Sequence, residues 1–79
     1  MHELGLCESL LEAVERRAAG RRVLGVKFRV GEQHRVVDEA FDQSFEIVAA
    51  GTVAEGAEVE LEVVPGDELM LESIRVEAT

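Results

Sequence analysis

Two segments of the chain have the spacing of amphipathic helices. From Glu3 to Ala19, apolar residues recur every three or four positions, so one face of a helix would be apolar. The same spacing returns in a segment that begins at Val37 or Asp38, and Gly20 and Gly51 are placed to end the two helices. The expected core residues are Leu4, Cys7, Leu11, Val14 and Ala18 in the first helix and Phe41, Phe45 and Val48 in the second.

Three further segments alternate between apolar and polar residues, as half-buried strands do. They run over Arg22–Val30, Ala57–Val64 and Glu68–Glu77. The alternation of the third segment breaks in the middle, which predicts a β-bulge near Glu72 and Ser73. The side chains expected to face the core are Leu24, Val26, Phe28 and Val30 in the first strand and Val59, Leu61 and Val63 in the second.

This order of elements, α-β-α-β-β, predicts an α+β fold: a two-layer sandwich with two helices on one face of a three-stranded, mostly antiparallel sheet. The crossover through the second helix makes the first two strands parallel in direction. We expect the third strand to lie between them, so that each neighbouring pair is antiparallel. Pro65, Gly66 and Asp67 are turn residues and are expected to join the last two strands in a tight hairpin.

Length and charge limit the functions that the chain can have. Its 79 residues form a single domain, 1–79, and 17 acidic against 8 basic residues give a net charge of -9. Such an acidic chain without Trp or Tyr is a poor partner for nucleic acid. Its apolar runs are too short to cross a membrane, and its first residues do not follow the pattern of a signal peptide. We therefore expect a cytoplasmic protein.

The residues that enzymes use for catalysis do not form a recognisable motif. The serines are not near a histidine in the sequence, and the glycines are too scattered for a phosphate-binding loop. The one cysteine, Cys7, lies on the apolar face of the first helix and is expected to be a small buried side chain. The sequence therefore predicts a protein that is not an enzyme.

The first three residues have the chemistry of a metal chelate. The α-amine of Met1 and the imidazole and backbone nitrogen of His2 are close together through covalent geometry alone, and Glu3 adds an amide or a carboxylate. Nitrogen ligands of this kind suit Cu(II) and Ni(II) in square-planar coordination. On residue chemistry alone, a frayed and solvated terminus is the alternative.

The chain resembles the HypA family, which incorporates nickel into hydrogenase and urease. The resemblance begins with the N-terminal stretch MHELGLCESLLEAVE and continues in order through KFRVGE, EAFDQSFEIVAAGT, AEGAEVELEVVP and GDELMLESIRVE. It implies a metallochaperone that binds Ni²⁺ through the amine of Met1, the imidazole and amide of His2 and the amide of Glu3. It also implies a HypB-like GTPase and a hydrogenase large subunit as partners.

The chain departs from the family where a zinc domain with two CxxC motifs is normally inserted. Here Val64 and Pro65 run directly into Gly66 and Asp67, so the junction lies near residues 64–67 and no zinc is expected. His34 lies in a loop that also departs from the family; it is either an extra nickel ligand or a solvated side chain.

A second function stays open beside nickel delivery. The chain would then be a metal-free interaction module of a maturation complex, with the outward glutamates Glu58, Glu60 and Glu62 as its contact surface. The expected sheet has open edges, which also leaves room for a homodimer.

Overall fold

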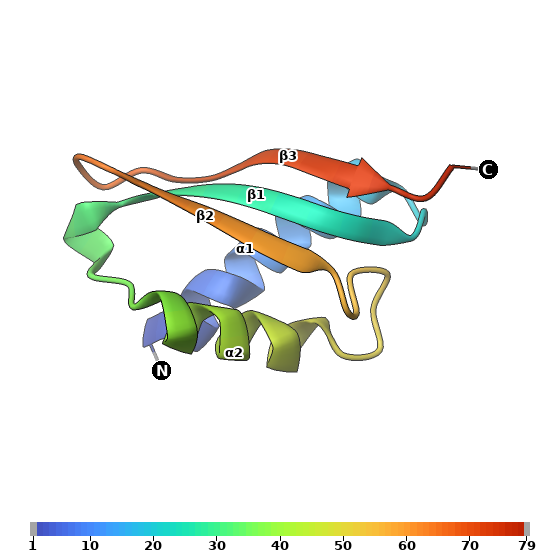
Figure 1. Cartoon of the computed structure of the whole chain (residues 1–79), viewed down its shortest axis with the longest axis horizontal. Coiled ribbons are helices and arrows are strands. Elements are labelled where there is room, and N and C mark those ends of the chain that lie inside the picture. Colours follow the sequence, from blue (N-terminus) through green and yellow to red (C-terminus); the bar gives the residue numbers. More distant parts are fainter. Residues whose placement is uncertain (1, 79) are drawn as a thin grey trace.

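A computed structural model describes residues 2–78, with side chains from Glu3 onward. Its two helices lie on the same face of one three-stranded sheet, which confirms the α+β fold and the order α-β-α-β-β (Figure 1). In chain order the elements are α1 (His2–Ala18), β1 (Val23–Gly31), a short 3₁₀ helix η1 (Glu32–His34), α2 (Asp38–Ala49), β2 (Glu58–Val64) and β3 (Leu69–Val76).

The core lies between the helices and the sheet. Phe28 on β1 packs edge-on against Phe41 and Phe45 of α2, with ring centroids 5.7 and 5.3 Å apart. Such edge-to-face contacts add to the stabilisation that burial alone provides. The side chains in the described part of the chain that form this core are Cys7, Leu10, Val14, Ala18, Val23, Val26, Phe28, Val30, Phe41, Phe45, Ala49, Ala54 and Leu71.

The strand order is β2-β1-β3, so the expectation that β3 lies in the middle was wrong. As expected, β1 and β2 run in the same direction; because they are neighbours, they pair in parallel, while β1 and β3 pair antiparallel. The sheet is therefore mixed. The central place suits β1 because its apolar residues are the most deeply buried and because it carries Lys27 and Arg29 between the glutamates of both outer strands.

Two irregularities interrupt the pairing of β1 with β3. Lys27 is opposite Ser73 and Phe28 is opposite Leu71, so Glu72 is the extra residue and the predicted bulge is confirmed. A second shift makes Leu24 an extra residue on β1. Leu24 was expected to face the core, but it is 43% exposed, and Val23 is buried in its place because the bulge changes the phase of the alternation.

The link between β2 and β3 is not a hairpin, because β1 lies between the two strands. Residues 65–68 instead cross the end of β1, at the left of Figure 1. The N–H of Gly31 donates to the carbonyl of Glu68 at 2.6 Å, and the N–H of Gln33 donates to the carbonyl of Gly66 at 3.0 Å. The link is therefore fastened to the segment that follows β1.

No helix among residues 2–78 is long and apolar enough to cross a membrane.

Candidate functional site

The predicted metal site lies at the start of α1. Met1 and the side chain of His2 fall outside the described residues, and the helix begins with His2. Glu3 lies in the first turn, and its side chain is partly exposed. The first N–H groups of an α-helix have no carbonyl four residues earlier to bind. The amides of His2 and Glu3 are therefore not held in the hydrogen-bond ladder of the helix.

The start of α1 packs beside the first half of α2. The thiol of Cys7 is fully buried there and donates a long hydrogen bond, 3.7 Å, to the carbonyl of Phe41. Burial, and then the negative charges of Glu3 and Asp42, raise the pKa of the Cys7 thiol to about 12. Cys7 is therefore a buried, protonated side chain that packs α1 against α2.

His34 lies at the link that crosses β1. Its Nε2 is 2.9 Å from the carbonyl oxygen of Asp67. This contact occupies one ring nitrogen, so His34 helps to hold the link against η1. Among the described residues, no three His, Cys, Asp or Glu side chains come together in a way that would hold a metal ion.

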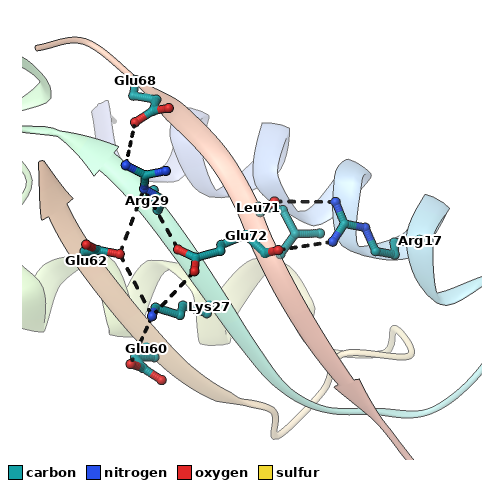
Figure 2. Close-up of polar contacts among 8 residues, drawn as sticks. All are labelled: Arg17, Lys27, Arg29, Glu60, Glu62, Glu68, Leu71 and Glu72. Atoms are coloured by element: carbon teal, nitrogen blue, oxygen red, sulfur yellow. Dashed lines mark hydrogen bonds and ion pairs between the residues drawn. The ribbon is translucent and has the colours of Figure 1, made fainter.

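The open face of the sheet carries a network of charges that Figure 2 shows from above. Lys27 lies within 3.9 Å of Glu60 and Glu62 and 3.6 Å from Glu72. Arg29 lies 3.9 Å from Glu62 on β2 and from Glu72 on β3, and 3.5 Å from Glu68 in the link that precedes β3. The outward glutamates were interpreted as a solvated or contact surface, but cations partly neutralise them: Lys27 and Arg29 of β1 lie near Glu60 and Glu62, and Arg75 of β3 lies 3.1 Å from Glu58. In the sequence, Lys27 and Arg29 alternate with apolar residues of β1, and this pattern could have indicated that cations share the open face of the sheet with the glutamates.

Comparison with known proteins gives one consistent family. The chain matches, over residues 1–76, a family model described as "Hydrogenase/urease nickel incorporation, metallochaperone, hypA". It is 44% identical over 66 residues to "Hydrogenase maturation factor HypA" of Geobacter sulfurreducens. The matched region covers 84% of this chain and 60% of that relative. It is also 45% identical over 69 residues to the protein of the same name from Beijerinckia indica. That match covers 84% of this chain and 61% of the relative.

A relative with lower identity matches a similar share of the chain. "Hydrogenase maturation factor HypA" of Legionella pneumophila strain Lens is 33% identical over 70 residues, which is 85% of this chain and 62% of the relative. The chain thus spans about 60% of the length of the curated relatives that it matches.

Proposed function

Because the chain belongs to the HypA family of hydrogenase/urease nickel-incorporation metallochaperones, we propose that it captures Ni²⁺ at its N-terminus and delivers it to a hydrogenase. Family members are metallochaperones, so the task is the transfer of a metal ion and not catalysis. The observation that carries the proposal is the start of α1 at His2, which leaves the amides of His2 and Glu3 outside the helical ladder.

The ligands are four nitrogens: the amine of Met1, the amide and imidazole of His2, and the amide of Glu3. Four nitrogens in a plane suit Ni²⁺. Two deprotonated amides neutralise the charge of the ion, so the positive end of the α1 dipole does not repel the complex. A site built from three consecutive residues needs no other part of the fold.

Transfer is favoured by the position of this chelate. Among the described residues, none of those that form the core precedes Cys7, so an acceptor ligand could approach an ion held by the first three residues without unfolding the core. A square-planar ion has open axial positions, through which a ligand of the acceptor can enter before the nitrogen ligands leave. The Cys7 thiol is fully buried against α2, so it does not face the solvent from which an ion would approach.

The partners that we propose are a HypB-like GTPase and the large subunit of a hydrogenase, in the cytoplasm. The relatives are named as hydrogenase maturation factors, which favours hydrogenase over urease as the target. We further propose that this chain works without zinc, because the one cysteine in its sequence is insufficient for a Cys₄ site.

Calorimetric titration of Ni²⁺ into protein that begins with Met1 tests the proposal. We expect binding of one ion per chain and a diamagnetic, square-planar spectrum. His2→Ala should lose this binding while the circular dichroism of the fold is unchanged. His34→Ala is the matched control, because it removes the other histidine of the chain, and it should bind as the parent does. Equal affinity in the parent and in His2→Ala would contradict the proposal.

A further inference from the structure

The two outer strands of the sheet differ in how their free edges are protected. On β3, the guanidinium of Arg17 reaches over from α1 and donates to the carbonyls of Glu72 and Leu71 at 3.4 and 3.5 Å (Figure 2). The bulge at Glu72 interrupts the same strand. Bulges and charged side chains at an edge are the usual means by which proteins prevent another strand from pairing there.

The edge of β2 has no bulge, and no side chain from another described element binds its backbone, although the strand carries exposed glutamates. Its seven residues pair with β1 in an unbroken register from Glu58 to Val64. Within residues 2–78, no hydrogen bond joins the backbone of β2 to an element other than β1. Every second residue of an edge strand directs its N–H and C=O away from the sheet. The edge of β2 therefore offers a row of donors and acceptors to an added strand.

A groove lies beside this edge on the helix side of the sheet. It has a volume of about 250 Å³ and separates the start of β2 from α2. Small and apolar side chains form most of its wall, and the carboxylates of Asp42 and Glu46 on α2 complete it. The residues that line it are Asp42, Phe45, Glu46, Ala49, Ala54, Gly56, Ala57 and Val59. Farther along β2, Val63 was expected to be buried but is 52% exposed on this same side.

The opposite side of β2 is acidic. The side chains of Glu58, Glu60 and Glu62 are 84%, 72% and 49% exposed. The cations near them, Lys27, Arg29 and Arg75, all belong to β1 and β3, so among the described residues no ion pair reaches these glutamates from the free edge of β2. An added strand would thus meet carboxylates on one side and, on the other, a groove lined by small and apolar side chains together with the carboxylates of Asp42 and Glu46.

We propose that β2 is a docking edge for an extended segment of a partner protein in which basic and apolar residues alternate. The segment adds a fourth strand beside β2 through main-chain hydrogen bonds. Its lysines or arginines face the glutamates of β2, and its apolar residues enter the groove between β2 and α2. This interaction is independent of nickel, since none of its residues belongs to the N-terminal chelate.

Charge favours this occupant over a second copy of the chain. If two β2 strands paired with each other in antiparallel register, their outward glutamates would lie opposite one another. Like charges directly opposite on neighbouring strands are destabilising. The same carboxylates stabilise a strand with lysines in those positions.

The test uses a capped peptide of alternating valine and lysine that matches the 7 residues of β2. Binding is measured by calorimetry, and its location by amide chemical shifts and hydrogen exchange. We expect the outward amides of β2 to become protected from exchange. Two control peptides should each bind about tenfold more weakly. One has the same composition with its lysines in one block, and the other is N-methylated at the amides that face β2.

Protein variants supply the matched control. Glu60→Arg should weaken binding of the alternating peptide about tenfold, whereas Glu12→Arg, an equal change of charge on the exposed face of α1, should change it less than about threefold. Equal binding of the N-methylated peptide, equal effects of the two variants, or shifts that map to β3 would each overturn the proposal. Dimerisation through β2, detected by sedimentation of the free chain, would overturn it as well.

Discussion

The carbonyl of Gly66 lies against Gly31, in the space that a Cβ atom on residue 31 would occupy. This contact exists because the link from β2 to β3 crosses the end of β1 instead of turning back on itself. Gly31 is buried, and its N–H donates to Glu68 at 2.6 Å across the same junction. The close approach at this crossing therefore depends on a residue without a side chain.

Gly31→Ala should destabilise the protein by about 2–3 kcal/mol, because the new methyl group would meet backbone atoms that cannot move without breaking the junction. Urea unfolding followed by circular dichroism measures this loss. Gly5→Ala is the control: Gly5 lies in α1 with no atom within 4 Å of an added Cβ. It should stabilise the protein by about 0.5–1 kcal/mol. Similar effects of the two substitutions would show that the link does not press on Gly31.

The buried Cys7 thiol should be unreactive in the folded protein. Its pKa, raised from 9.0 to about 12, keeps it protonated at pH 8, and its surface is not accessible. We expect alkylation by iodoacetamide to be fast in urea and slow in buffer, with the rate followed by mass spectrometry.

The same raised pKa makes stability depend on pH. Above pH 9 the unfolded chain loses the thiol proton while the folded chain retains it, so the free energy of unfolding should fall between about pH 9 and 12. Cys7→Ala should remove this part of the decrease. An unchanged pH profile in that variant would assign the decrease to other groups.

Nickel binding should become stronger as the pH rises, because the proposed ligands release protons when they bind the ion. We expect the affinity to rise by at least about tenfold per pH unit between pH 6 and 8. One glycine added before Met1 should weaken binding, since it moves the amine out of its chelate ring. Removing the ion with a chelator should leave the melting temperature almost unchanged, because the core does not include the ligands. A large drop on chelation would instead indicate a metal bound within the fold.

Arg29 should contribute more to stability than Arg75, although both form ion pairs on the open face of the sheet. Arg29 is 37% exposed and lies among three carboxylates, whereas Arg75 is 62% exposed and pairs only with Glu58 among the described residues. Arg29→Met should cost about 1–2 kcal/mol, and Arg75→Met less than about 0.5 kcal/mol. Thermal melts of the two variants at low and high salt measure both losses of stability. A smaller loss for Arg29→Met at high salt would identify screening of the remaining carboxylates as the cause.

Local patterns in the sequence predicted both α-helices and all three strands, since each depends on the spacing of apolar residues within one segment, whereas the 3₁₀ helix η1 falls in a stretch expected to be a loop. They also predicted the bulge at Glu72, because an extra residue changes the phase of the alternation in β3 itself. The bulge at Leu24 was missed, since Val23 and Leu24 are both apolar and either can face the core. The predicted strand order was wrong for a related reason: a strand shows the same alternation of apolar and polar residues whether it lies at the centre or at the edge of the sheet.

The candidate metal site is the most local feature of all. Its proposed ligands belong to three consecutive residues, and covalent geometry keeps them together in any fold, so the sequence alone determined that this chemistry was available. The tertiary structure decided what lies far apart in the chain: the central place of β1, the contact of Gly31 with Gly66 and the open edge of β2. These depend on which segments meet, and the pairing of distant segments is set by the packing of the whole core.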